Sequence, residues 1–208
     1  MTTRASPAPA IAVFCSGRGT NLQAILNATR RGTLRARVAL VISDRANANA
    51  LARAKKAGVC TLFIDPKAFP SKEAYERMLI QQCQEAGAQV ICLAGFMRIL
   101  SPVFVKHFRH RILNIHPALL PAFPGAHAVA DALAWGVHVT GVTVHLVDEQ
   151  VDHGPILLQE AVTIDSNETE DHLLTRIHAV EHRLYPKAIA LLLAGRIKIH
   201  GRRLRVAS

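Results

Sequence analysis

The 208-residue sequence is poor in aromatic side chains and lacks long apolar runs. Phe, Trp and Tyr make up 5% of the chain, so the stacking platforms on which many nucleic-acid binding proteins rely are scarce. The longest apolar runs, such as residues 139–147, are interrupted by Thr, His or Gly. They fall far short of the roughly 20 residues that span a bilayer. We therefore expect neither a membrane protein nor a dedicated nucleic-acid binding protein.

Cysteine is also sparse, and its pattern excludes a disulfide framework. The four cysteines form no C-x-x-C pair, and the first ten residues contain an Arg and two prolines instead of the apolar stretch of a signal peptide. We expect a cytoplasmic protein with reduced thiols. Cys15, Cys60, Cys83 and Cys92 lie in or beside apolar patterns, which core packing explains. The eleven histidines include no H-E-x-x-H motif, so we expect no metal site.

Basic residues, in contrast, are in excess. The 25 Lys and Arg against 15 Asp and Glu give a formal net charge of +10, which attracts anionic partners over long range. The basic residues are scattered, so a solvated basic surface is the simpler interpretation. A non-catalytic module that binds anions or RNA stays open as an alternative function.

Short β-branched runs alternate with helical patterns along the chain. Nearly continuous apolar strands, as predicted here, are typical of a parallel sheet that is buried on both faces. The predicted strands are 11–15, 38–42, 61–64, 90–94, 112–115, 139–147 and 156–164, with a terminal strand or hairpin in 196–206. The predicted helices are 21–31, 48–57, 71–86, 102–107, one that ends at 135, and 168–194, which Pro186 starts or kinks.

These elements predict one Rossmann-like α/β domain over residues 11–200. Its central sheet is mostly parallel with an antiparallel C-terminal part, because the loop between the last two long strands is short, and helices cover both faces. Residues 1–10 are predicted to form a flexible extension, and residues 201–208 a basic tail.

A glycine-containing turn joins the first strand to the first helix, where backbone N–H groups and the helix dipole favour an anion. Gly17 and Gly19 permit close approach of a phosphate, although a tight turn alone would also explain them. The loop is not a Walker A motif, and Leu22 stands where a full G-x-G-x-x-G has its third glycine. Asp44, at the end of the second strand, keeps a dinucleotide-binding enzyme open as an alternative.

Asn114 and His116 lie two residues apart at the carboxyl end of a predicted strand, so both side chains point to one side. Ligands of open α/β sheets bind outside these strand ends. An amide and an imidazole side by side can stabilise an oxyanion and move a proton. Asp152, in a loop rich in carboxylates, is the candidate third partner, and a carboxylate beside His116 would favour the imidazolium.

Six short motifs follow one another in this chain. They read SGRGTNLQAI at 16–25, LAGFMRILS at 93–101, LNIHPALLP at 113–121, TVH at 143–145, VDHGP at 151–155, and EH followed by YP within 181–186. In this order they resemble the phosphoribosylglycinamide formyltransferases, folate-dependent enzymes of purine biosynthesis. The resemblance implies formyl transfer from the co-substrate 10-formyltetrahydrofolate to the amine of glycinamide ribonucleotide, without a metal or a covalent enzyme intermediate.

The resemblance also assigns roles to residues. Asn114 would hold the formyl oxygen, protonated His116 would stabilise the oxyanion, and Asp152 would orient His116 and assist proton transfer. The residues implied on the ribonucleotide side are Gly19, Thr20, Asn21, Pro117 and Glu181. The residues implied on the folate side are Lys72, Met97, Arg98, Ile99, Leu100, Asn114, Asp148, Glu149, Gln150, Val151 and Asp152.

Two relatives with the same chemistry remain alternatives: methionyl-tRNA formyltransferases and formyltetrahydrofolate hydrolases. The first carry a further tRNA-contacting domain and the second a preceding regulatory domain, so the chain length favours the ribonucleotide as acceptor. The expected partners are small-molecule substrates, with no nucleic acid or membrane, and the expected assembly is a monomer or homodimer. Some relatives carry Arg at the position of Lys72. The lysine ammonium is a point charge and cannot bind a folate carboxylate through two parallel hydrogen bonds, as a planar guanidinium can.

Overall fold

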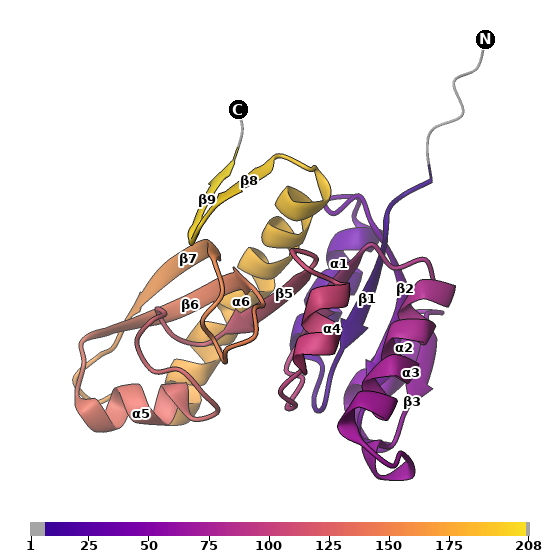
Figure 1. Ribbon diagram of the computed structural model, residues 1–208. Coiled ribbons are helices and arrows are strands. Elements are labelled where there is room, and N and C mark those ends of the chain that lie inside the picture. Colours follow the sequence, from indigo (N-terminus) through magenta and orange to yellow (C-terminus); the bar gives the residue numbers. More distant parts are fainter. Residues whose placement is uncertain (1–6, 207–208) are drawn as a thin grey trace.

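The computed structural model describes residues 7–206 of the chain (Figure 1). Most of the predicted N-terminal extension, residues 1–6, and the last two residues of the predicted basic tail, 207–208, lie outside the described residues. Within the described part, one nine-stranded sheet has the order β3-β2-β1-β4-β5-β6-β7-β9-β8. The strands are β1 (Ala10–Phe14), β2 (Arg37–Ser43), β3 (Cys60–Phe63), β4 (Val90–Leu93), β5 (Ile112–His116), β6 (Val139–Leu146), β7 (Ile156–Thr163), β8 (Ile197–His200) and β9 (Arg203–Val206).

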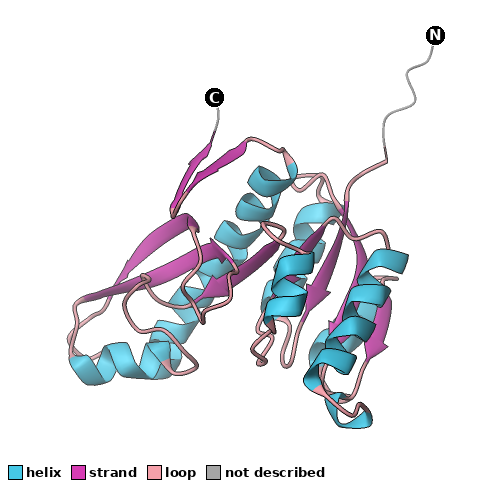
Figure 2. Ribbon diagram, viewed as in Figure 1, coloured by secondary structure: helices cyan, strands magenta, loops and turns pink. Residues whose placement is uncertain are grey.

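Helices lie in front of and behind this sheet (Figure 2). The helices are α1 (Thr20–Arg30), α2 (Asn49–Lys56), the short 3₁₀ helix η1 (Pro66–Ala68), α3 (Lys72–Glu85), α4 (Pro102–His107), α5 (Ala128–Trp135) and α6 (Glu170–Leu193). The strands from β3 to β5 pair in parallel, whereas the β5–β6, β6–β7 and β8–β9 pairs are antiparallel. The predicted fold class is confirmed.

Alternate residues of the strands pack into two separate cores, one on each face of the sheet. Ile11 and Val13 of β1 join a cluster with α1, α2 and α6, while Ala12 and Phe14 join a cluster with α3 and α4. This alternation follows from the two-residue period of a strand. Because both faces are covered, all five residues of β1 are buried, as the apolar run predicts.

The structure corrects the prediction for Cys60 and adds detail to those for Pro186 and for the terminal hairpin. Cys60 is exposed, so core packing does not explain it; it opens β3, the edge strand of the sheet, where cover is incomplete. α6 runs as one helix through Pro186, which is buried beside Tyr185, so Pro186 does not start a helix. The predicted terminal hairpin forms as β8 and β9, and β9 pairs with β7 at Ile156 and Arg203.

The strand order places the carboxyl ends of β1, β4 and β5 side by side. From β1 the sheet extends through β2 and β3 in one direction and through β4 and β5 in the other, so a switch point lies between β1 and β4. The loops that leave these two strands touch, because the Ser16 N–H donates to the Gly95 carbonyl at 2.9 Å. Open α/β sheets bind ligands at such a point. In the described part of the chain, no helix has the length and apolar character needed to cross a membrane.

Candidate active site

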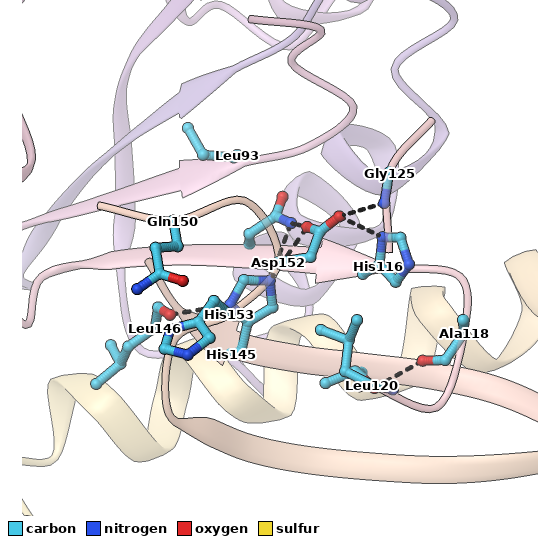
Figure 3. A network of polar contacts seen from close by, with 12 residues as sticks. Leu93, His116, Ala118, Leu120, Gly125, His145, Leu146, Gln150, Asp152 and His153 are labelled. Carbon is cyan, nitrogen blue, oxygen red and sulfur yellow. Dashed lines mark hydrogen bonds and ion pairs between the residues drawn. The ribbon is translucent and has the colours of Figure 1, made fainter. Parts of the chain in front are cut away.

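The three predicted catalytic side chains converge in the structure. Asn114 and His116 lie at the end of β5, and Asp152 comes from residues 147–155, the loop between β6 and β7, here called the Asp152 loop. Asp152 Oδ1 accepts from Asn114 Nδ2 at 3.3 Å, and Asp152 Oδ2 lies 3.4 Å from His116 Nδ1. Figure 3 shows the Asp152 carboxylate directed toward His116 and Gly125. One carboxylate therefore bridges the amide and the imidazole.

His116 faces an acceptor at each ring nitrogen. Its Nε2–H donates to the Phe123 carbonyl at 2.7 Å, and its Nδ1 lies 3.4 Å from the Asp152 carboxylate. A carbonyl and a carboxylate only accept hydrogen bonds, so a ring that carries hydrogen on both nitrogens can donate to both. His116 is 3% exposed, so these two acceptors lie beside a ring that is almost removed from water.

His145 completes the network. In the antiparallel pair of β5 and β6 it lies opposite Asn114. Its Nδ1 lies 2.9 Å from the Leu146 carbonyl oxygen, and its Nε2 lies 3.1 Å from Asn114 Nδ2 and 3.7 Å from Asp152 Oδ1. Asn114, His145 and Asp152 Oδ1 therefore meet at one point. Sequence reasoning had placed the TVH motif in the family pattern without a role for His145.

Asp152 also accepts a hydrogen bond from a backbone N–H, and its own backbone has an unusual conformation. The Gly125 N–H donates to its Oδ2 at 2.8 Å, and its own φ is 49°, in the left-handed region that non-glycine residues rarely adopt. Burial acts to raise the pKa of Asp152. The hydrogen bonds from His145 and Gly125 and the charge of His116 outweigh burial, so the pKa lies below its ordinary value of 3.8. Asp152 is therefore a carboxylate at neutral pH.

The backbone partners Phe123 and Gly125 belong to the segment that follows Pro117, the half-buried residue directly after β5. Phe123 has a φ of 50° and Gly125 a φ of 100°, so the chain turns sharply where it presents a carbonyl and an N–H to the site. The sequence did not predict these two groups, because every residue has a main-chain carbonyl and nearly every residue a main-chain N–H, so residue type does not mark them. Among residues 7–206, no group of three or more His, Cys, Asp and Glu side chains could hold a metal ion.

The predicted phosphate loop leads directly into α1. Gly19 is the N-terminal cap residue with a φ of 70°, and Thr20 begins the helix. No acidic side chain lies in the first turn of α1, so its free N–H groups and positive dipole end remain without an anionic partner from that turn. A Cβ on Gly19 would lie 2.7 Å from Ala50 Cα, which only glycine avoids. The loop therefore has the backbone form that an anion site requires.

Two residues that the family resemblance predicts on the ribonucleotide side, Asn21 and Glu181, meet in the core. Asn21 Nδ2 donates to Glu181 Oε2 at 2.9 Å, joining α1 to α6. Asn21 Oδ1 is buried without a partner among the described residues. One turn after Glu181, the Tyr185 hydroxyl donates to the carbonyls of Leu93 and Leu113, so α6 is fastened beside the residue that precedes Asn114. Burial raises the pKa of Glu181 to about 7, and the Asn21 hydrogen bond opposes this only in part.

The raised pKa of Glu181 makes the stability of the protein depend on pH. The folded carboxyl holds its proton up to about pH 7, whereas an unfolded one loses it near 4.5. The folded state therefore binds more protons in this window, and the free energy of unfolding falls as pH rises through it. We expect Glu181→Gln to stabilise the protein more at pH 8 than at pH 5, by about 2 kcal/mol.

Urea denaturation of wild type and variant at the two pH values measures this difference. Glu170→Gln, which removes an exposed carboxylate from the same helix, is the control and should change the free energy of unfolding equally at both pH values. A Glu181→Gln effect of the same size at pH 5 and pH 8 would contradict the assignment.

The predicted folate-side segment 97–100 is anchored to the phosphate loop. The Met97 N–H donates to Ser16 Oγ at 2.9 Å, and Ser16 Oγ donates to Asp44 Oδ1 at 2.6 Å. The second Asp44 oxygen lies 4.0 Å from Arg98 Nη1. Asp44 is thus engaged within the protein, which disfavours its predicted alternative role as the ribose-binding acid of a dinucleotide site.

The remaining residues that are predicted on the folate side differ in their surroundings. Met97 and Ile99 are each 63% exposed and Val151 is 51% exposed, whereas Leu100 is buried. Lys72 is exposed at the start of α3, and no hydrogen bond or ion pair joins it to Asp152 in the described part of the chain.

A cavity of about 480 Å³ lies beside the Asp152 loop. Its walls include Asp148, Glu149 and Gln150 from that loop, with Val105 and Lys106 of α4 opposite. Glu149 lies 3.8 Å from Lys106 Nζ, so the two walls also pair electrostatically. The structure brings three of the predicted folate-side residues to this cavity, while α4 contributes residues that sequence reasoning missed.

Comparison with known proteins defines the class of protein. The family model described as formyl transferase matches residues 10–189. Phosphoribosylglycinamide formyltransferase of Escherichia coli is 43% identical over 190 residues, which cover 91% of this chain and 90% of the relative. Glycinamide ribonucleotide transformylase 1 from Symbiobacterium toebii is 50% identical with a TM-score of 0.95, and the match covers 98% and 96% of the two chains.

A longer relative shares the same region. The trifunctional purine biosynthetic protein adenosine-3 of Drosophila pseudoobscura pseudoobscura is 46% identical over 194 residues, and this chain spans 14% of its length. The doubly wound fold, the polar site at the ends of parallel strands and these similarities agree. The chain belongs to the formyl transferase family. The family resemblance inferred from the six motifs is confirmed.

Proposed function

We propose that this protein transfers a formyl group from 10-formyltetrahydrofolate to the amine of N1-(5-phospho-β-D-ribosyl)glycinamide, a step of purine biosynthesis. The observation that carries the proposal is the Asp152 carboxylate, which accepts from Asn114 and lies 3.4 Å from His116 Nδ1, at the same end of the parallel strands as a helix N-terminus suited to a phosphate. The Escherichia coli relative is a phosphoribosylglycinamide formyltransferase, and the match covers 90% of its length.

The proposed reaction is a direct acyl transfer. The amine nitrogen attacks the formyl carbon, a C–N bond forms, and the formyl oxygen takes the electron pair of the double bond. The imidazolium of His116 and one N–H of Asn114 stabilise this oxyanion.

Collapse of the intermediate completes the transfer. The bond between the formyl carbon and N10 of the folate breaks, and the proton lost by the amine ends on N10. Asp152, a carboxylate at neutral pH, is placed to relay that proton while it keeps His116 charged. The phosphate of the ribonucleotide binds Gly19, Thr20 and Asn21 at the start of α1. Glu181 and the unpartnered Asn21 oxygen accept hydrogen bonds from the glycinamide ribonucleotide.

The folate takes the opposite side of the site. Met97, Arg98, Ile99 and Leu100 form one wall and residues 148–151 the other, with Lys72 near the carboxylate end of the cofactor. The exposed apolar side chains of Met97, Ile99 and Val151 support this assignment, because a bound pterin or benzoyl ring would remove them from water.

An acceptor assay tests the proposal. The protein is mixed with 10-formyltetrahydrofolate and one of three acceptors: the glycinamide ribonucleotide, methionyl-tRNA or water alone. The absorbance of the deformylated folate is then followed. We expect turnover that depends on the ribonucleotide. Turnover with methionyl-tRNA or water, or salt-sensitive RNA binding without turnover that survives His116→Ala, would overturn it in favour of the alternatives.

A further inference from the structure

The Asp152 loop contacts the C-terminal hairpin, a part of the chain that the proposed reaction does not use. β8 and β9 form the edge of the sheet beside β7 (Figure 1), and the turn between them carries Gly201 and Arg202. Gly201 has a φ of 59°, and the turn delivers the Arg202 guanidinium to His153. Arg202 and His153 also line the cavity beside the loop. The hairpin thus reaches the residue next to Asp152.

The contacts link Asp148, His153 and Arg202. His153 Nδ1 lies 2.7 Å from Asp148 Oδ2, and since a carboxylate only accepts, Nδ1 carries the hydrogen. Arg202 Nη1 lies over the other side of the ring, 2.6 Å from His153 Nε2 and 3.1 Å from Nδ1, and Arg202 Nη2 donates to the His153 carbonyl. The guanidinium therefore holds both the ring and the backbone of His153.

Two further contacts restrain the Asp152 loop. A Cβ on Gly154 would lie 1.8 Å from the Leu146 carbonyl oxygen, so the loop closes tightly on the end of β6. On the other side, Glu149 pairs with Lys106 of α4. Between these two points the Arg202 contact supports residues 148–153, where Asp152 is kept at a φ of 49°. A strained backbone conformation persists only where its surroundings enforce it.

We propose that Arg202 is a positioning residue, which acts through His153 to hold the Asp152 loop in the arrangement that receives the folate and orients Asp152. The inference rests on the proposed function for its kinetic consequences. Its structural part, the restraint of the loop by the hairpin, stands independently of the substrate.

Kinetics with matched variants test the proposal. We expect Arg202→Gln to raise KM for 10-formyltetrahydrofolate by about three- to tenfold and to lower kcat less, with KM for the ribonucleotide unchanged. Arg203→Gln removes the same charge from the neighbouring exposed position of the hairpin and should match wild type. His153→Ala should reproduce the Arg202→Gln effect without altering the hairpin. In a His153→Ala background, Arg202→Gln should have a smaller effect than in wild type, because only the contact of Arg202 with the carbonyl of residue 153 is left to remove.

Hydrogen exchange gives a readout that does not need turnover. Arg202→Gln and His153→Ala should each speed amide exchange in residues 147–155, where the Gln150 N–H donates to Asp148, while Arg203→Gln leaves it unchanged. Wild-type folate KM and unchanged loop exchange in both variants would overturn the inference. So would additive effects of the two substitutions, or an equal rise in both KM values. Absence of formyl transfer by the wild type would instead overturn the proposed function, and loop exchange would still decide the role of Arg202.

Discussion

Asp152→Asn should lower kcat for formyl transfer by about a hundredfold or more, the size expected when support for oxyanion stabilisation is removed. Asp152 Oδ2 both accepts from the Gly125 N–H and faces His116 Nδ1, so an asparagine oxygen in that position keeps both contacts but carries no charge. Its NH2 group then takes the position of Oδ1, where it meets the Asn114 amide nitrogen, which also only donates. The site keeps the contact of His116 with Phe123 and loses the negative charge that supports an imidazolium during the reaction. Steady-state kinetics at saturating substrates measure the loss.

Asp171→Asn is the matched control, because it neutralises an exposed carboxylate on α6 that lies outside the site. It should leave kcat unchanged. Thermal melting of both variants shows whether the fold is intact. A folded Asp152→Asn protein with wild-type kcat would show that the carboxylate has no part in the reaction, and His116→Ala and Asn114→Ala, for which we expect losses of similar size, would then decide the remaining roles.

Gly19→Val should raise KM for the ribonucleotide by about tenfold or more and affect KM for the folate far less. A Cβ there meets Ala50 Cα and Cβ at 2.7 Å, and a β-branched residue is disfavoured at a φ of 70°. The loop must shift, and the free N–H groups at the start of α1 shift with it. Because these groups are proposed to hold the phosphate, the loss falls on one substrate. Initial rates with each substrate varied in turn measure it.

Gly32→Val provides the control for backbone strain. Gly32 has a similar φ of 75°, but a Cβ there meets nothing within 4 Å, and the residue lies beyond the other end of α1. This variant should lose stability without a change in either KM. Equal increases in both KM values for Gly19→Val would argue that the substitution disturbs the whole site and not the phosphate loop alone.

Much of the site was predictable because it depends on local pattern. The two-residue period of β5 directs Asn114 and His116 to one side, and the glycine turn before α1 follows from the change of period from strand to helix. Asp152 was predictable as a candidate only in combination with the family motifs. Its approach to within 3.3 to 3.4 Å of the other two depends on how the loop between β6 and β7 folds back.

Other features required the assembled sheet. His145 meets Asn114 because β5 and β6 pair in the register that places them opposite each other, and register is a relation between two strands rather than a property of either. Cys60 carries an apolar strand pattern like its neighbours, yet β3 lies at the edge of the sheet and leaves it exposed. Arg202 stands 49 residues from His153 in the chain, and no local signal links them.

The amino-acid sequence by itself determined the order and type of the elements, since apolar period, glycine turns and helix caps act over a few neighbouring residues. It also predicted which side chains are candidates for formyl transfer. Only the tertiary structure decided which acceptors face His116, which strand supplies the partner of Asn114, and how the hairpin supports the Asp152 loop. These outcomes depend on distances between segments far apart in the chain, and packing of the whole sheet sets those distances.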